Sequence, residues 1–195
     1  MSARVTGVVL AGGQGSRMGG IDKGLRDFRG RPLVGHAIER LAPQVDELLV
    51  NANRNPEAYA RFGYRVIADE IEGFAGPLAG FERGIAHASG SLVVTVPCDS
   101  PFLPMDLVQR LGEALRSKEA ELAVAKTGDQ AHPVFSLMRR SVHESLRGFL
   151  SKGERKIDRW YAGLRVVEVP FDDEPEAFLN INTLDELAGL ERPGR

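Results

Sequence analysis

Short apolar runs alternate along the chain with stretches in which apolar residues recur every three or four positions. In the first half, runs rich in β-branched residues predict strands over residues 5–10, 48–51, 64–69 and 92–96. The amphipathic stretches between them predict helices over residues 32–41 and 77–87, each with a proline in its first turn. This alternation is typical of a parallel sheet that carries helices on both faces.

The second half has a less regular pattern. Strands are expected over residues 122–125, 133–138 and 164–169. Helices are expected from Pro104, over 141–150, and from Thr183, which forms a capping box with Glu186. The spacing does not fix the strand directions here, and mixed or antiparallel pairing with an antiparallel edge strand stays open for this part of the sheet. Together the elements predict an α/β fold, a Rossmann-like three-layer α/β/α sandwich with a mostly parallel sheet, and 195 residues favour one domain.

A glycine-rich loop follows the first expected strand directly. Its glycines are Gly12, Gly13, Gly15, Gly19 and Gly20. Without a Cβ atom, glycines let the main chain bend sharply and bring N–H groups close to a ligand. Arg17 and Lys23 are the only cations of this segment. Successive amides beside two cations predict an oxyanion site, most suited to a polyphosphate, with a flexible turn as the alternative.

Two common phosphate motifs do not fit this loop. A P-loop needs Gly-x-x-x-x-Gly-Lys followed by Ser or Thr, whereas Lys23 stands between Asp22 and Gly24. The dinucleotide fingerprint Gly-x-Gly-x-x-Gly would need a glycine where Met18 stands. The sequence therefore indicates neither an ordinary P-loop NTPase nor an NAD enzyme.

Polar residues also stand at the ends of the other strands expected in the first half. Asn51 and Asp69 each end such a strand, and Asp99 follows the most apolar one. Ligands of open α/β sheets bind beyond the carboxyl ends of the strands. We therefore expect these residues to form one site with the glycine loop. Asn51 and Asp69 are also common turn formers, which is the alternative for both.

Asp99 and Lys23 are the candidates for chemistry at this edge. A carboxylate where a buried strand leaves the core suits Mg²⁺, which takes one or two carboxylates plus substrate phosphates and water. Capping of the next helix is the alternative for Asp99. A fixed Lys23 would stabilise negative charge that develops on phosphoryl oxygens, unless it is a solvated surface lysine. Arg17 has the same interpretation, with bracing of the loop as its alternative.

Several motifs together resemble a known family. Leu10-Ala-Gly-Gly-x-x-x-Arg17-Met-Gly19, followed by Asp22-Lys23, resembles the signature of nucleotidyltransferases that join an NTP to a phosphorylated acceptor. Further blocks are Asn-Ala-Asn-Arg at 51–54, Gly-Pro-Leu-Ala-Gly at 76–80, Pro-Cys-Asp-Ser-Pro at 97–101 and Asn-Ile-Asn-Thr at 180–183. In this order, and over nearly the whole chain, the set resembles the molybdenum cofactor guanylyltransferases.

This resemblance implies the transfer of GMP from GTP to molybdenum-molybdopterin. It implies one nucleotidyltransferase domain over 1–195, with the nucleotide bound by residues 5–100 and the acceptor by residues 101–190. Mg²⁺ would be the cofactor, held by Asp99. The implied nucleotide contacts include the main chain of Leu10, Ala11 and Gly12 and the side chains of Lys23, Asn51, Asp69 and Asp99, besides Gly13 and Gly15 of the loop.

Residues of the second half are candidates for binding the acceptor. Asn180 and Asn182 lie two positions apart, so on an extended strand they would face the same way. They would then hydrogen-bond a pterin or the phosphate of molybdopterin, with a turn before the last helix as the alternative. Arg155 is suited to an anionic acceptor, although a solvated charge run explains it equally well.

Net charge, hydropathy and cysteine content restrict the binding partners and the compartment that we expect. A net charge of −2 provides no basic field for nucleic acid, and no apolar stretch approaches the roughly 20 residues of a membrane span. Cys98 is the only cysteine, which favours a reducing cytoplasm. The resemblance implies GTP and molybdenum-molybdopterin as substrates, and transient contact with proteins that supply the precursor or receive the product. We expect a monomer.

Three other functions stay open at this point. A cytidylyltransferase for the same acceptor and a sugar-phosphate nucleotidyltransferase would share the first motif. A nucleotide-binding adaptor that delivers cofactor without chemistry belongs to a different class. The joint presence of Arg17, Lys23 and Asp99 argues against the adaptor, because binding alone would not require the metal ligand.

Overall fold

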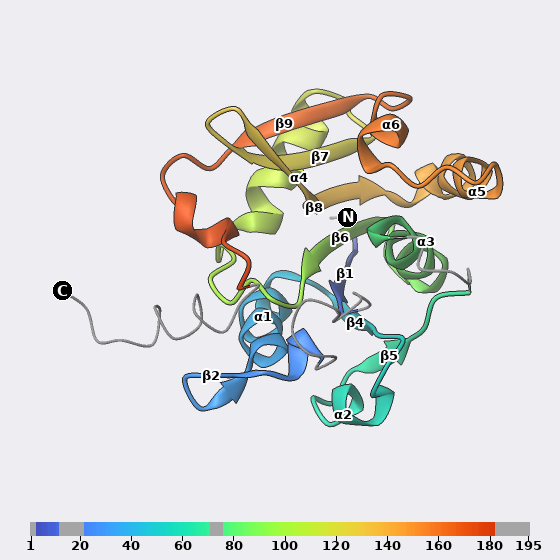
Figure 1. Ribbon diagram of the computed structural model, residues 1–195. Coiled ribbons are helices and arrows are strands. Elements are labelled where there is room, and N and C mark those ends of the chain that lie inside the picture. Colours follow the sequence, from blue (N-terminus) through green and yellow to red (C-terminus); the bar gives the residue numbers. More distant parts are fainter. Residues whose placement is uncertain (1–2, 12–21, 71–75, 182–195) are drawn as a thin grey trace.

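A seven-stranded sheet with helices on both faces forms the centre of the computed structural model (Figure 1). The structure describes residues 3–11, 22–70 and 76–181. In spatial order, the strands are β5 (Arg65–Ile67), β4 (Glu47–Asn51), β1 (Val5–Leu10), β6 (Leu92–Pro97), β8 (Gln130–Arg139), β7 (Leu122–Thr127) and β9 (Val166–Pro170). The expected three-layer sandwich is confirmed.

Strand direction divides this sheet into two parts. The neighbours β5, β4, β1 and β6 all run parallel, and β7 and β9 are also parallel to each other. Strand β8 is antiparallel to both β6 and β7. The mostly parallel sheet is therefore confirmed, and so is mixed pairing among the strands of the second half. The antiparallel strand lies inside the sheet, where it pairs on both sides, and β9 is the edge strand.

Alternation along β1 explains why both faces are covered. Val9 packs in one apolar cluster and its neighbour Val8 in the other, because successive side chains of a strand point to opposite faces. The first cluster lies under α1 (Leu33–Leu41), α2 (Pro56–Ala60) and α4 (Leu107–Ser117). The second lies under α3 (Pro77–His87), α5 (His143–Ser151) and α6 (Ile157–Tyr161) (Figure 1). Among the helices that the structure describes, none is long and apolar enough to cross a membrane.

Short elements complete the connections. They are η2 (Lys23–Leu25), the hairpin strands β2 (Asp27–Phe28) and β3 (Arg31–Pro32), η3 (Ala42–Gln44), η4 (Arg140–Val142) and η5 (Pro175–Phe178).

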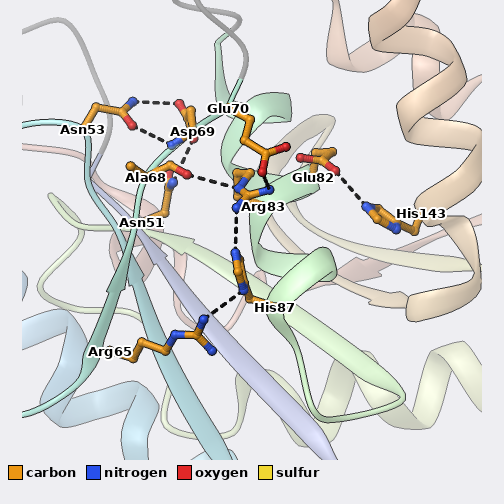
Figure 2. A network of polar contacts seen from close by, with 10 residues as sticks. All are labelled: Asn51, Asn53, Arg65, Ala68, Asp69, Glu70, Glu82, Arg83, His87 and His143. Atoms are coloured by element: carbon orange, nitrogen blue, oxygen red, sulfur yellow. Dashed lines mark hydrogen bonds and ion pairs between the residues drawn. The ribbon is translucent and has the colours of Figure 1, made fainter.

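On the face of the sheet that α3 covers, a polar contact joins α3 to α5. Glu82 of α3 is only 6% exposed, and its Oε1 atom lies 2.9 Å from Nε2 of His143 at the start of α5 (Figure 2).

Helix boundaries follow the expectations with one clear exception. The helix expected over residues 77–87 is α3, with the same bounds. The helix expected from Pro104 begins only at Leu107. The side chain of Gln44 accounts for this start, because its Oε1 accepts a hydrogen bond from the Val108 amide at 3.0 Å while its Nε2 donates to the Pro104 carbonyl at 2.9 Å. The helix expected from Thr183 lies outside the described residues.

Candidate active site

The carboxyl ends of the parallel strands are level with one another. Leu10, at the end of β1, pairs with Asn51 of β4 and with Pro97 of β6, and Asn51 in turn pairs with Ile67 of β5. The Cys98 amide continues the pattern by donating to the Leu10 carbonyl at 3.0 Å. The residues that follow these strands therefore emerge side by side at one edge of the sheet.

Asp99 and Lys23 face each other at this edge. The Lys23 Nζ atom lies 3.8 Å from Asp99 Oδ2, and Asp99 is only 8% exposed. Burial raises the pKa of the Asp99 carboxyl, and the nearby Lys23 ammonium opposes that shift only in part. The alternative that Asp99 caps α4 does not hold, because that helix begins at Leu107 and receives a cap from Gln44. The arrangement is a buried carboxylate beside a cation.

A set of contacts with α2 holds Lys23 in place. Asp22, the residue before it, accepts hydrogen bonds from the Gly24 amide at 3.2 Å, from Asn55 Nδ2 at 3.2 Å and from the Tyr59 hydroxyl. Tyr59 is fully buried, so this anchor comes from the core. Gly24 leaves room for it, since a Cβ atom there would lie 2.5 Å from the Tyr59 hydroxyl oxygen.

Asn51 and Asp69 meet beside the end of β4. Asn51 Nδ2 donates to Asp69 Oδ1 at 2.8 Å, and Asn51 itself is 2% exposed. Asn53 forms two hydrogen bonds with Asp69: the Nδ2 atom of Asn53 donates to Asp69 Oδ2 at 2.7 Å, and its Oδ1 atom accepts from the Asp69 amide at 2.8 Å (Figure 2). Both oxygens of the Asp69 carboxylate are thereby oriented by amide groups.

Helix α3 approaches this pair closely. A Cβ atom at Gly80 would lie 2.5 Å from Asn51 Oδ1 and 2.7 Å from Leu10 Cδ2. Gly76 precedes the helix with φ +69°, a left-handed conformation that glycine adopts without strain. The Gly-Pro-Leu-Ala-Gly block therefore provides a turn at its first glycine and close packing against Asn51 at its last.

The expected acceptor residues are placed in different parts of the fold. Asn180 accepts a hydrogen bond from the Ser100 hydroxyl at 2.5 Å, and the following residue, Ile181, donates from its amide to the Asp99 carbonyl at 3.0 Å. Asn180 therefore lies beside the Asp99 loop. Arg155 donates from its guanidinium to the Leu150 carbonyl at 2.9 Å, at the end of α5, and is not part of the Asp99 and Lys23 cluster.

Several expected site residues cannot be placed. Arg17, Gly12, Gly13, Gly15 and Asn182 lie outside the described residues. Other residues of the site were not predicted at all: Tyr59, Asn55 and Asn53 hold Asp22 or Asp69. The signal for Asn53 was its place in the Asn-Ala-Asn-Arg block, two positions after Asn51. Tyr59 and Asn55 carried no signal, since more than thirty positions separate them from Asp22.

Asp99 is the residue at this edge that could hold Mg²⁺. Within residues 3–11, 22–70 and 76–181, no group of three or more potential metal-ligating side chains is present. Mg²⁺ does not require one, because it commonly takes one or two carboxylates and completes its shell with substrate phosphates and water. Asp99, a buried carboxylate at the edge of the sheet, fits that role.

Comparisons with known proteins identify the fold and the domain. The family model for the MobA-like NTP transferase domain matches residues 7–167. A solved structure, the molybdopterin-guanine dinucleotide biosynthesis protein A from Archaeoglobus fulgidus, superposes with a TM-score of 0.80 at 26% identity, covering 95% of this chain and 96% of that one. Fold and domain match together define a nucleotidyltransferase.

Relatives at higher identity define the family. A molybdenum cofactor guanylyltransferase from Cupriavidus metallidurans is 53% identical over 188 residues, which are 94% of this chain and 92% of the relative. Another, from Shewanella putrefaciens, is 50% identical over 186 residues and 95% of each chain. The chain belongs to the molybdenum cofactor guanylyltransferase family.

Proposed function

We propose that this protein transfers GMP from GTP to molybdenum-molybdopterin, giving molybdopterin guanine dinucleotide and pyrophosphate. Family membership supports the reaction class and the substrates. The observation that carries the proposal is the pairing of Lys23 with the buried Asp99 at the carboxyl edge of the sheet, with Asn51 and Asp69 alongside.

The chemistry needs positioning and charge neutralisation more than proton transfer. The terminal phosphate of the acceptor attacks the α-phosphorus of GTP in line. A new oxygen–phosphorus bond forms, and the bond to the bridging oxygen breaks, so that its electron pair leaves with pyrophosphate. A phosphate monoester is largely ionised at neutral pH, since its second pKa is about 6, and no general base has to be assigned.

Lys23 and Asp99 act on the phosphate end of the nucleotide. Negative charge grows on the phosphoryl oxygens and on the departing pyrophosphate, so the fixed ammonium of Lys23 stabilises the transition state more than the ground state. Arg17 and the glycine loop would add donors to the same triphosphate. Asp99 would hold Mg²⁺, which supplies a divalent charge to the phosphates when bound.

Asn51 and Asp69 hold the nucleoside in this proposal. A carboxylate has about four acceptor positions, and the amides of Asn51 and Asn53 use one on each oxygen of Asp69. The remaining positions match ribose hydroxyls or the N1–H and N2–H₂ edge of guanine. Because the two amides already orient the carboxylate, little ordering would be needed when the nucleoside binds.

The acceptor is assigned to the other side of Asp99. The hydrogen bond between Asn180 and Ser100 supports this assignment. Asn182 and Arg155 are the further proposed acceptor contacts, with Arg155 reaching the acceptor from the end of α5, outside the Asp99 and Lys23 cluster. We place the reaction in the cytoplasm, with the protein acting as a monomer that meets the precursor-supplying and cofactor-accepting proteins transiently. The buried thiol of Cys98, the only cysteine, is compatible with a reducing compartment.

Release of pyrophosphate tests the function directly. The purified protein is incubated with molybdenum-molybdopterin and Mg²⁺, and GTP is compared with CTP. We expect pyrophosphate release to be at least about tenfold faster with GTP than with CTP, because a modest difference in base recognition changes the rate by about this factor. Faster release with CTP would make the protein a cytidylyltransferase. Release with sugar 1-phosphates in place of molybdopterin would overturn the acceptor, and GTP binding without release would indicate an adaptor.

A further inference from the structure

One arginine of α3, Arg83, contacts the segment that carries Asp69. Arg83 Nε donates to the Ala68 carbonyl at 3.1 Å, and its NH1 group lies 2.7 Å from Glu70 Oε1. The guanidinium therefore contacts the residues on both sides of Asp69 (Figure 2). Only 14% of the Arg83 side chain is exposed. Its remaining amino group, NH2, lies 2.7 Å from His87 Nε2, one turn further along the helix.

His87 must be neutral for this arrangement to hold. Arg65 of β5 approaches the other ring nitrogen, with its NH2 group 3.1 Å from His87 Nδ1 (Figure 2). Arginine only donates hydrogen bonds, and a neutral imidazole has a single acceptor nitrogen. We assign Nε2 as the acceptor because the Arg83 contact is the shorter one, and the approach of Arg65 to Nδ1 is then not a hydrogen bond. An imidazolium ring would have no acceptor and would place a third positive charge between two guanidinium groups.

The charges around His87 favour the neutral form. Burial lowers the pKa of His87, and the cations Arg83 and Arg65 lower it further. Glu70, in the segment after β5, and Glu82, on the same helix, oppose this shift without reversing it. His87 therefore becomes protonated, and loses its contact with Arg83, only when the solution becomes acidic.

We propose that Arg83, oriented by neutral His87, is the positioning residue that sets Asp69 for nucleoside recognition, so that protonation of His87 weakens GTP binding. This inference rests on the proposed function, in which Asp69 contacts the nucleoside. It concerns the nucleoside end alone. Lys23 is held by a different set of contacts, through Asp22 and Tyr59, and none of the contacts described for Arg83 reaches them.

The first test removes the guanidinium. In Arg83→Gln, dissociation constants for GTP, ITP and inorganic pyrophosphate are measured by calorimetry with Mg²⁺ present. We expect GTP to bind about tenfold more weakly and pyrophosphate to bind as in the wild type, with kcat at saturating GTP within about twofold. ITP lacks the 2-amino group, so the preference for GTP over ITP should shrink. Arg147→Gln, which removes an exposed arginine from α5, is the charge-matched control.

The outcomes separate this inference from the proposed function. If the wild type binds GTP and transfers GMP, but Arg83→Gln weakens GTP and pyrophosphate equally or neither of them, the positioning role is wrong and the function stands. If the wild type binds no GTP, the proposed function itself fails. A general loss of folding would appear as equal weakening of every ligand and would also count against a positioning role.

The second test addresses His87 and does not depend on the stability of the arginine variant. His87→Gln keeps a carbonyl acceptor for Arg83 at every pH but cannot become charged. GTP binding is compared between the two proteins from about pH 8 to about pH 5, because the γ-phosphate titrates equally in both. We expect parallel curves above about pH 6.5 and a progressive additional weakening of the wild type below it. Curves that stay parallel down to pH 5 would overturn the role of His87.

Discussion

The hydroxyl of Tyr59 donates a hydrogen bond to the carboxylate of Asp22, the residue that directly precedes Lys23. This contact ties the fully buried Tyr59 of α2 to the start of η2. Lys23, which lies 3.8 Å from Asp99, is therefore positioned by a tyrosine far away in the sequence. A cation that is already in place contributes more to transition-state stabilisation than one that must be ordered during the reaction.

Removing that hydroxyl tests the anchor. In Tyr59→Phe the aromatic ring stays in the core, but Asp22 loses its buried donor. We expect a loss of about 1–2 kcal/mol in the free energy of unfolding and a fall of about tenfold in kcat, because Lys23 is less well fixed. Thermal denaturation and steady-state rates of pyrophosphate release measure both. Tyr64→Phe, which removes the hydroxyl of a half-buried tyrosine between α2 and β5, should leave kcat unchanged. An unchanged kcat in both variants would refute the anchor.

Asp99→Asn should separate activity from stability. We expect a fall of about 100-fold or more in the rate of transfer, since the carboxylate proposed to hold Mg²⁺ is lost. At neutral pH the variant should nevertheless unfold at a higher temperature than the wild type, because burial raises the pKa of Asp99 and its charged form therefore opposes folding. Asp173→Asn is the contrast: Arg110 lowers the pKa of that exposed carboxyl, so its loss should lower the melting temperature slightly.

The same carboxyl predicts how that stability difference depends on pH. With a raised pKa, folded Asp99 binds its proton more tightly than unfolded Asp99 does. The contribution of Asp99 to the free energy of unfolding therefore decreases as pH rises from the unfolded pKa of about 3.9 through the folded value. We expect wild type and Asp99→Asn to converge in denaturant titrations near pH 4 and to diverge towards pH 7. A constant difference across that range would show that the carboxyl is not perturbed by burial.

Arg155 distinguishes acceptor binding from helix stabilisation. Its guanidinium donates to the Leu150 carbonyl, where a cation also interacts favourably with the end of α5. If it also contacts the acceptor as proposed, Arg155→Ala should raise KM for molybdenum-molybdopterin by about tenfold while KM for GTP stays constant. The measurement is a pair of substrate titrations with the other substrate saturating. A lower melting temperature with both KM values unchanged would leave Arg155 as a helix cap only.

Much of this fold could be predicted because individual segments carry their own signal. The buried run of β1 and the proline that opens α3 each mark an element without reference to the rest of the chain. The position of β8 could not be read in this way. Its apolar residues predict a strand but not the partners of that strand, and the pairing with β6 and β7 depends on contacts between distant segments.

The same limit applies to the site. Asp99, Asn51 and Asp69 stand where strands end, and parallel strands bring such positions to one edge, so their proximity was predictable. Tyr59 and Arg83 act through contacts between elements. Tyr59 has the pattern of a core residue and Arg83 that of a helical surface residue, and only the packing of α2 and α3 gives them their roles.

At Gly80, the effect of a substitution on packing can be separated from its effect on GTP binding. Its helix lies so close to the sheet that a Cβ atom would meet Asn51 Oδ1 at 2.5 Å, and Asn51 is itself held by Asp69. Gly80→Ala should therefore cost about 1–3 kcal/mol in the free energy of unfolding and weaken GTP binding by about tenfold. Denaturant titration and calorimetry provide the two numbers.

Gly84, one turn along the same helix, supplies the matched comparison. A Cβ atom there would meet Val8 Cγ2 at 2.7 Å, a core side chain without a polar role. Gly84→Ala should be destabilised like Gly80→Ala, yet its folded fraction should bind GTP normally. Gly148→Ala, where an added Cβ atom meets nothing within 4 Å, should instead gain about 0.5–1 kcal/mol. If Gly80→Ala and Gly84→Ala weaken GTP binding equally, overall stability is the cause, and Asn51 loses its assigned part in holding the nucleoside.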